Sequence, residues 1–169
     1  LRSNDAYTPG GKAGFRPDRT VDTYTQILKK LYPHIPVVVG GIEASLRRLT
    51  HYDYWSNSLQ RSILATSGAD LLIYGMGDKP IREVAKALRN GFNMKLLRGL
   101  RQVGFLADKE YVERLYNQSS KVLSTYEECV EDKAKFGENF TVIETLSNMM
   151  ECNTTLIEGV GDKYVVITP

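Results

Sequence analysis

The fold of this chain is restricted above all by a short apolar run that ends in two glycines, PVVVGGIEASLRR at residues 36–48. A β-branched run followed by a polar segment is typical of a buried parallel strand that leads into a turn and a helix. Glycine can adopt positive φ angles and lets another group approach the backbone closely. Because ligands of open α/β sheets bind at the carboxyl ends of strands, we expect a contact site here. Its candidate residues are Gly40, Gly41, Glu43, Arg47 and Arg48.

The same pattern recurs at residues 70–78, where DLLIY is followed by GMGD. The sequence predicts a second buried strand, a glycine turn, and a helix that Asp78 caps and that ends before Gly91. Two strand–turn–helix units predict a parallel α/β sheet of Rossmann type with flanking helices. Gly75 and Gly77 join the candidate contact residues. The third glycine of a dinucleotide fingerprint and the lysine of a P-loop are missing, so a structural turn is favoured over a phosphate site.

The other segments predict helices, one more strand and a C-terminal hairpin. Asp18 is placed to cap one helix and Asp108 another. Ser124 and Glu127 have the spacing of a capping box that opens a long helix, which we expect to be interrupted near Gly137. The remaining predicted elements are a loop over residues 3–17, a helix over 58–67, a strand over 101–106, and hairpin strands over 155–158 and 163–168. The long helix is expected to bury Val130, Ala134, Phe140, Ile143, Leu146 and Met150.

Composition limits the class of protein. The chain has 169 residues, of which 42% are hydrophobic and 25% charged, as in a single globular domain. A net charge of +2 does not indicate a nucleic acid, a membrane surface or an acidic substrate as partner. No apolar run approaches the ~18 residues of a membrane span and no signal-peptide pattern is present, so we expect a cytoplasmic protein. Cys129 and Cys152 have the wrong number and spacing for disulfide, zinc or iron–sulfur motifs, and are expected to be reduced thiols.

The segment HYDYW at residues 51–55 is predicted to be an aromatic-rich loop, and it carries residue types that binding sites use. His51 and Asp53, together with Glu43, are of the types found in metal sites or acid–base pairs. His51 and Asp53 lie only two residues apart, however, and a third ligand for a metal has to be assumed. We therefore favour a histidine that is hydrogen-bonded to a neighbour in an aromatic surface patch. The aromatic rings, Trp55 among them, can stack on a base or cofactor or cover an interface, and we favour the interface.

The charged residues near the first glycine turn have a simple local explanation. Glu43 and Arg47 lie four residues apart, which favours a surface ion pair of a few tenths of a kcal/mol, roughly. Arg47 and Arg48 are suited to clamp a carboxylate or phosphate, but adjacent helical residues point in different directions, so one ligand is not expected to use both. No Ser/His/Asp constellation can be assembled around His34 or His51. The residues themselves therefore give no support for catalysis within this chain.

Two long stretches resemble a known family: NDAYTPGGKAGFRPDR at residues 4–19 and GGIEASLRRLTHYDYWS at residues 40–56. They closely resemble the N-terminal region of the YgiQ-like family of radical S-adenosylmethionine (radical SAM) proteins, described as Fe-S oxidoreductases. The resemblance covers about residues 3–90 and returns at 161–169. It implies a cobalamin-binding-like domain, whose last two strands end at the two glycine turns, followed by a radical SAM barrel with a [4Fe-4S] cluster.

The chain departs from the family's cofactor motifs. The Cys-x3-Cys-x2-Cys motif that holds the [4Fe-4S] cluster has no counterpart here. Neither His34 nor His51 lies in the Asp-x-His-x-x-Gly motif that supplies the lower ligand of cobalamin, and Gly77-Asp78 replaces the Gly-Glu of cobalamin-linked relatives. The resemblance therefore implies a segment without its own cofactor, argues against cobalamin, and places the cluster and S-adenosylmethionine elsewhere in the parent protein.

The resemblance implies a non-catalytic accessory segment whose partner is the barrel of the same parent chain, acting on an unknown substrate. Residues 1–92 would form the second half of the cobalamin-binding-like domain, and residues 93–169 a mixed α/β extension toward the barrel. Two alternatives stay open. One is a stand-alone Rossmann-type module that binds a small ligand at the glycine turns, and the other is a structural module that self-associates through open strand edges.

Overall fold

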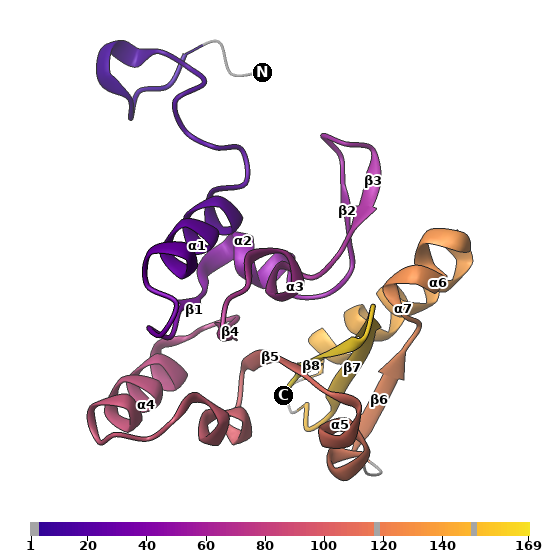
Figure 1. Ribbon diagram of the computed structural model, residues 1–169. Coiled ribbons are helices and arrows are strands. Elements are labelled where there is room, and N and C mark those ends of the chain that lie inside the picture. Colours follow the sequence, from indigo (N-terminus) through magenta and orange to yellow (C-terminus); the bar gives the residue numbers. More distant parts are fainter. Residues whose placement is uncertain (1–3, 117–118, 150–151) are drawn as a thin grey trace.

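The computed structural model describes residues 4–116, 119–149 and 152–169. Six strands form one mixed sheet, and a separate hairpin consists of β2 (His51–Asp53) and β3 (Ser58–Gln60) (Figure 1). The six are β1 (Val38–Val39), β4 (Leu71–Ile73), β5 (Val103–Ala107), β6 (Ser120–Leu123), β7 (Thr155–Val160) and β8 (Lys163–Ile167). Their order is β1-β4-β5-β8-β7-β6, in which β1–β4 and β6–β7 are parallel and the other neighbours antiparallel.

Helices cover both faces of the sheet. The α-helices are α1 (Thr20–Leu31), α2 (Gly41–Leu46), α3 (Ile63–Ser67), α4 (Asp78–Arg89), α5 (Lys109–Leu115), α6 (Tyr126–Glu131) and α7 (Lys133–Ser147). Two short 3-10 helices are η1 (Pro9–Gly11) and η2 (Met94–Gly99). One core cluster joins the sheet to α1, α2, α3, α6 and α7, and the other joins it to α4, α5 and η2.

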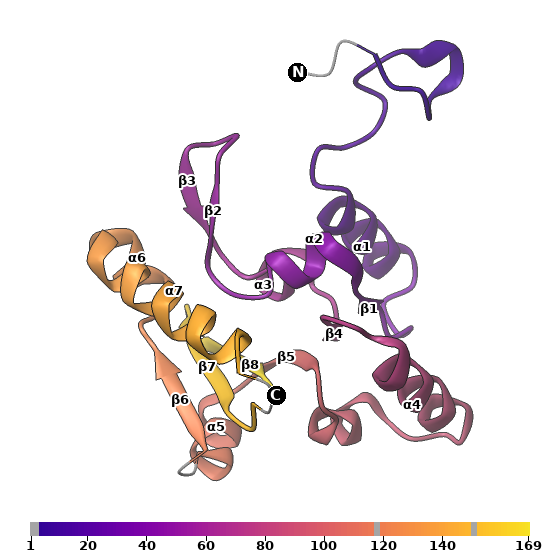
Figure 2. The ribbon, with the colours of Figure 1, turned by 180° about the vertical axis from the view of Figure 1, so that it is seen from behind.

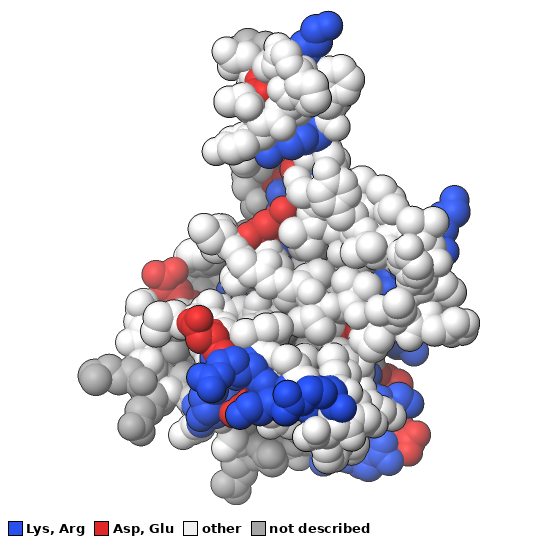
Figure 3. All heavy atoms as spheres, turned by 90° about the vertical axis from the view of Figure 1, so that its left-hand side faces the viewer, with Lys and Arg blue, Asp and Glu red and all other residues white. Residues whose placement is uncertain are grey.

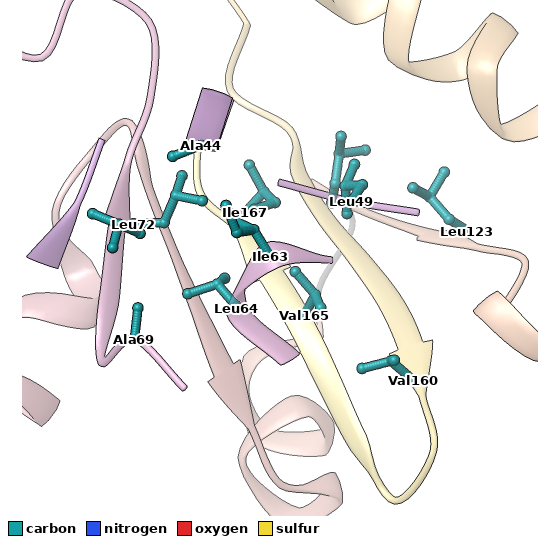
Figure 4. Packing of buried hydrophobic residues seen from close by; sticks show 12 residues of the cluster. Ala44, Leu49, Ile63, Leu64, Ala69, Leu72, Leu123, Val160, Val165 and Ile167 are labelled. Atoms are coloured by element: carbon teal, nitrogen blue, oxygen red, sulfur yellow. The ribbon is translucent and has the colours of Figure 1, made fainter. Parts of the chain in front are cut away.

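Alternation along the strands divides the side chains between these two clusters. In β4, Leu72 belongs to the first cluster, whereas Leu71 and Ile73 belong to the second. Figure 4 shows Leu72 converging with other residues of the first cluster. Because successive side chains of a strand point to opposite faces, a strand buried on both sides must be apolar at every position. This explains the continuous apolar runs from which strands were predicted.

The predicted α/β fold class is confirmed, with helices flanking a sheet that contains a parallel β1–β4 pair in the register Val38↔Leu71. Gly91 lies just beyond α4 with φ +78°, as the stop signal predicts. The C-terminal hairpin is present as β7 and β8, with Gly161 at φ +60° in its turn. The division at residue 92 stays a prediction, and strands from both sides of it pair in the same sheet. No described helix is long and apolar enough to span a membrane.

The helix predicted over residues 58–67 is wrong in its first part. Residues 58–60 instead pair with residues 51–53, and Asn57 makes the turn with φ +50°. Helix α3 begins only at Ile63, because the Ser62 hydroxyl accepts a hydrogen bond from the amide of Leu64 at 3.3 Å. The segment around His51 is therefore the first strand of a hairpin rather than a loop.

The capping box and the interruption in the long helix are each displaced from the predicted residues. Thr125 Oγ1 accepts from the amide of Glu128 at 3.1 Å, and Glu128 accepts from the amide of Thr125 at 2.9 Å, so the box lies one residue beyond Ser124. The interruption falls at Asp132, whose extended backbone and side-chain cap end α6 and start α7. Gly137 lies inside α7.

Two other predicted caps are wrong, and the buried face of α7 differs from the prediction. Arg19 and Gly77 occupy the cap positions of α1 and α4 without a side-chain cap, in place of Asp18 and Asp78. The predicted cap at Asp108 is confirmed, since its carboxylate accepts from the amide of Tyr111 at 2.8 Å. Ile143 and Leu146 pack on the core as predicted, whereas Val130, Ala134 and Phe140 are exposed; Met150 lies outside the described residues.

Candidate functional site

The two glycine turns meet at one cavity. Because β1 and β4 are parallel neighbours, their carboxyl ends lie side by side. A cavity of about 360 Å³ opens there, lined by Val38, Val39, Gly40, Gly41, Ile73, Gly75, Gly77, Asp78 and Ile81. The structure thus brings together the four glycines that the sequence singles out, in a site made largely of backbone and apolar side chains.

Glycine is required at several of these positions for steric reasons. Gly41 and Gly75 have φ angles of +81° and +66°, in the left-handed region that other residues rarely adopt. A Cβ atom on Gly77 would lie 2.8 Å from Ile73 Cγ2, and one on Gly40 would lie 3.2 Å from the Ile73 carbonyl oxygen. The glycines therefore let the two strand ends and α4 pack closely, which gives them a structural role before any ligand is considered.

Glu43 and Arg47 form the predicted local ion pair. Arg47 Nη1 lies 2.9 Å from Glu43 Oε1, and both side chains are half-buried. The other carboxylate oxygen of Glu43 accepts from the amide of Val21, in the first turn of α1, at 3.4 Å. Glu43 therefore compensates for the missing side-chain cap of α1 and ties α2 to it. Both charges are accounted for by contacts inside the chain.

The β2–β3 hairpin is anchored by Asp53. This buried carboxylate accepts from Arg19 Nη2 at 2.8 Å and from Ser56 Oγ at 2.6 Å. The hydrogen bonds from Ser56 and Arg19 hold the pKa of Asp53 below its usual value. Asp53 therefore fixes the hairpin turn and links it to the start of α1, and its lone pairs are used for that purpose.

His51 takes the role that was favoured for it, a histidine hydrogen-bonded to a neighbour. Its Nδ1 lies 3.1 Å from the carbonyl oxygen of Leu49. Because a carbonyl can only accept, this bond places the proton on Nδ1, and burial lowers the pKa of the ring. Within the described ranges of the chain, no group of three or more His, Cys, Asp or Glu side chains is placed to hold a metal ion.

The hairpin presents its aromatic side chains to solvent. Tyr52, Tyr54 and Trp55 are all exposed, and the rings of Tyr54 and Trp55 stack with centroids 4.7 Å apart. Figures 1 and 2 show the hairpin extending away from the six-stranded sheet. An extended element that carries large exposed rings is typical of an interaction surface.

A groove runs between the hairpin base and α7, with a volume of about 510 Å³. One wall comes from Leu46, Arg48, Leu49, Thr50, His51 and Tyr52, and the other from Phe136, Asn139, Phe140, Ile143, Glu144 and Ser147. Leu46 is 71% exposed and Phe140 56%, so the rims are apolar and accessible. This docking groove, as we call the cavity lined by these residues, joins parts of the sequence about ninety residues apart.

The base of the docking groove is held by a buried carboxylate that the sequence does not reveal. Glu158 on β7 is 1% exposed and accepts a hydrogen bond from the amide of Thr50 at 2.8 Å. Burial raises the pKa of this carboxyl to about 7. Glu158 therefore couples the start of β2 to the central sheet, and its proton is retained well above the pH at which an exposed glutamate ionises.

The two cysteines are free, as expected. Cys129 is fully buried, and Asn139 Nδ2 donates to its Sγ at 3.3 Å. Burial raises the pKa of this thiol to about 11, so it is protonated and unreactive at neutral pH. The described residues thus do not fit a [4Fe-4S] cluster, which requires several thiolate ligands.

Positive charge is more concentrated than the composition suggests. Helix α4 carries four exposed cations at helical spacing that share one side of the helix, namely Lys79, Arg82, Lys86 and Arg89. Figure 3 shows Lys and Arg side chains gathered in the lower part of the face where α4 lies. A charged stripe opposite the apolar face is also what a surface helix requires for solubility.

The predicted contact residues fall into three places. The first place is the glycine cavity, which is lined by Gly40, Gly41, Gly75 and Gly77. The second is the ion pair of Glu43 and Arg47. The third is the docking groove with its adjoining hairpin: Arg48 and His51 line the groove, and Asp53 and Trp55 belong to the hairpin. Phe140, Ile143 and Glu158 were missed as site residues. The helical spacing of apolar residues in α7 singles out Phe140 and Ile143, but nothing in the local sequence indicates that they face residues 46–52.

Comparison with known proteins gives a consistent result. A protein named UPF0313 from Porphyromonas gingivalis is 47% identical over 169 residues, which is all of this chain and 26% of the relative. UPF0313 proteins from Bacteroides thetaiotaomicron and Clostridium perfringens are 44% and 41% identical, over 28% and 25% of their lengths. The chain thus spans about a quarter of the length of the curated relatives it matches. No solved structure matches it.

The family assignment rests on the whole sequence rather than on one motif. Residues 1–169 match the family described as Radical SAM N-terminal, and the matched range includes both glycine turns, the hairpin and α7. This agrees with the resemblance carried by residues 4–19 and 40–56. The chain belongs to the Radical SAM N-terminal family.

Proposed function

We propose that this chain is the non-catalytic N-terminal accessory segment of a radical S-adenosylmethionine iron–sulfur protein, and that its docking groove binds the catalytic part of the same polypeptide. Family membership and the length of the relatives, about four times that of this chain, support the proposal. The [4Fe-4S] cluster and S-adenosylmethionine would then be bound outside residues 1–169, where reductive cleavage of S-adenosylmethionine would give a radical for an unknown substrate.

The observation that carries the docking proposal is the position of the docking groove. Leu46 and Phe140 expose apolar surface on its two rims, and the hairpin adds a stacked aromatic pair nearby. Pro169 lines an adjoining cavity that shares Arg48 and Ile143 with the groove. Polypeptide that continues beyond Pro169 in longer relatives would therefore start beside an accessible apolar groove, which is how intramolecular domain contacts commonly form.

The test is a pair of phenylalanine variants in the full-length protein. Phe140→Ser removes an aromatic side chain from the groove rim, whereas Phe92→Ser removes one of similar exposure, 51%, outside the groove. We expect Phe140→Ser to lose cross-links between this segment and the catalytic part, because truncating an aromatic anchor at an interface commonly costs more than about 1 kcal/mol. Equal cross-linking in both variants would refute the docking role.

Glu43 and Arg47 are poorer probes of docking, because Glu43 also supports the first turn of α1. A loss of activity in their variants would not separate docking from folding. The catalytic half of the proposal has its own test. Full-length protein with a reconstituted cluster should cleave S-adenosylmethionine when reduced, and failure to do so with an intact cluster would contradict the assignment to radical chemistry.

A second candidate function is supported by the glycine cavity. Its position at the carboxyl ends of two parallel strands is where Rossmann-type domains bind small ligands. Titration calorimetry with nucleotides, S-adenosylmethionine and cobalamin separates the two proposals, because the accessory-segment proposal predicts no tight binding there. Self-association is the third candidate, since β1 and β6 form the edges of the sheet. Equal oligomeric states of this chain and the full-length protein in light scattering would count against it.

A further inference from the structure

A cavity of about 280 Å³ lies beside the docking groove and carries two arginines. It is bordered by the end of α2, the start of β5, the end of β8 and the C-terminal part of α7. Its polar lining comes from Arg48, Tyr74, Arg101, Gln102, Ser147 and Thr154. None of the described residues that line it is acidic. This cavity, the arginine cavity, therefore concentrates hydrogen-bond donors and positive charge.

Arg48 is half-buried without a matching anion. Its Nη1 donates to the carbonyl oxygen of Ser45 at 2.6 Å, and its guanidinium carbon lies 5.1 Å from the ring centre of Tyr74. Its Nε is buried and has no hydrogen-bond acceptor among the described residues. Burial lowers the pKa of this guanidinium. A partly desolvated cation that has no carboxylate beside it is costly unless an anion balances its charge.

Arg101 brings a second guanidinium to the same cavity. Its Nη1 donates to Asn153 Oδ1 at 3.1 Å and its Nη2 to the carbonyl oxygen of Cys152 at 3.0 Å. Both acceptors are neutral, so the charge of Arg101 is also left without a carboxylate within the described part of the chain. The guanidinium fork is suited to bind two oxygens of one carboxylate or phosphate.

The acidic side chains nearby do not fill this role. Glu43 is paired with Arg47, and Glu158 accepts from the amide of Thr50. Glu144 lines the neighbouring docking groove and forms no ion pair with Arg48. Arg101 is exposed and Arg48 half-buried, and both charges are left available to an anion from outside the described residues.

We propose that the arginine cavity binds an oxyanion, a carboxylate or phosphate group, between Arg48 and Arg101. Gln102 supplies a further amide donor, while the Tyr74 hydroxyl is already engaged with the Thr168 carbonyl oxygen. The anion comes either from a small molecule or from an acidic side chain of polypeptide outside residues 1–169. Both sources present the same chemistry to the two guanidinium groups.

The test uses the full-length protein with inorganic phosphate as the probe, at fixed ionic strength. Titration calorimetry compares wild type with Arg48→Met, which removes the charge at similar length, with Arg101→Met, and with Arg82→Met on α4 as control. For a small-molecule anion we expect saturable binding by wild type and Arg82→Met, none by Arg48→Met, and at least about tenfold weaker binding by Arg101→Met. Equal phosphate affinity in Arg48→Met and wild type would overturn the proposal.

Hydrogen exchange without phosphate distinguishes the other source. If an internal carboxylate fills the cavity, calorimetry should detect no phosphate binding to wild type. Arg48→Met should then speed amide exchange at residues 45–50, and Arg48→Lys, which keeps the charge, should restore part of the protection. Absence of phosphate binding together with equal exchange in the Met and Lys variants would overturn the proposal. If Arg48→Met does not fold, Arg101→Met provides the test. Phosphate binding or amide exchange equal to that of wild type in Arg101→Met would also contradict the proposed site.

Discussion

The glycine cavity and the docking groove are built in opposite ways. The glycine cavity is made by two strand–turn units that are adjacent in the sheet, and its contacts are mostly backbone and apolar. The docking groove joins residues 46–52 to α7, and its character comes from side chains. Local pattern therefore suffices to find the first, whereas the second exists only once the central sheet has brought distant segments together.

The difference also separates structural from functional roles. Gly40 and Gly77 are in close contact with Ile73, so their sequence pattern is explained by packing. The exposed apolar surface of Leu46, Phe140 and Trp55 is not covered by any other part of the described chain. Substitutions should accordingly change stability at the glycine cavity, and change association at the groove rims with little effect on stability.

The largest expected effect on stability comes from the floor of the docking groove. Leu49 is 3% exposed and belongs to the first core cluster, shown in Figure 4. Leu49→Ala should lower the free energy of unfolding by about 2–5 kcal/mol, because it leaves a cavity in a packed core. Leu46→Ala in the same segment is the matched control and should cost under about 0.5 kcal/mol. Urea unfolding measures both, and similar losses would contradict the division between floor and rim.

The next effect is a pH dependence caused by Glu158. Its folded-state pKa of about 7 is above the ordinary value of 4.5, so the folded state binds the proton more tightly than the unfolded state. The stabilisation from its protonated form is fully present below about pH 4.5 and is lost as the pH rises to about 7, by up to roughly 3 kcal/mol.

Glu158→Gln keeps an oxygen acceptor for the Thr50 amide and should remove this fall in stability between pH 4.5 and 7. Unfolding free energies of wild type and variant across that range provide the measurement. Glu144→Gln, at an exposed position of α7, is the control and should keep the wild-type dependence. A pH profile of Glu158→Gln that parallels wild type would show that another group is responsible.

A smaller effect is expected at the glycine cavity. Gly77→Ala places a Cβ 2.8 Å from Ile73 Cγ2 and should destabilise by about 1–3 kcal/mol through overpacking. Gly137→Ala, inside α7 with no atom near its Cβ, should instead stabilise by about 0.5–1 kcal/mol. Thermal or urea unfolding compares them. Stabilisation by Gly77→Ala would mean that the cavity is looser than the close contact implies.

The smallest effect on stability is expected at the hairpin tip. Trp55 and Tyr116 are both 61% exposed; Trp55 belongs to the hairpin whose first strand contributes His51 and Tyr52 to the docking groove, whereas Tyr116 follows α5. Trp55→Ser and Tyr116→Ser should each change the unfolding free energy by less than about 0.5 kcal/mol. In the full-length protein, only Trp55→Ser should reduce cross-linking to the catalytic part. Loss of stability in Trp55→Ser would instead give the aromatic pair a folding role.

Sequence reasoning succeeded where a feature depends on neighbouring residues. The buried strand at residues 71–73, the stop at Gly91, the Glu43–Arg47 pair and the C-terminal hairpin each follow from local spacing and are confirmed, whereas the first predicted strand is a two-residue edge strand of which only Val39 is buried. It failed at the hairpin strand of residues 58–60, where pairing with residues 51–53 overrides a helical pattern. The capping box lies one residue beyond its predicted place because local sequence does not distinguish Ser124 from Thr125 as the cap.

The candidate site was only half accessible to that reasoning. The glycines could be paired because parallel strands end at the same edge of a sheet. Arg48 was identified, but Arg101, which lines the same cavity, and the buried Glu158, which accepts from the Thr50 amide, were not, because each comes from more than fifty residues further along the chain. Strands β5 and β8 bring these distant segments together because β5 pairs antiparallel with both β4 and β8. The purely parallel sheet predicted from the sequence does not contain these pairings.

Hydrogen exchange tests the central claim, that the docking groove is covered by the rest of the full-length protein, most directly. Amide exchange in α7 and residues 46–52 is compared between this chain and the full-length protein, with α4 on the other face of the sheet as reference. We predict about tenfold or greater slowing in α7 and residues 46–52 in the full-length protein, and none in α4. Equal rates along the groove, or slowing confined to α4, would contradict the docking role.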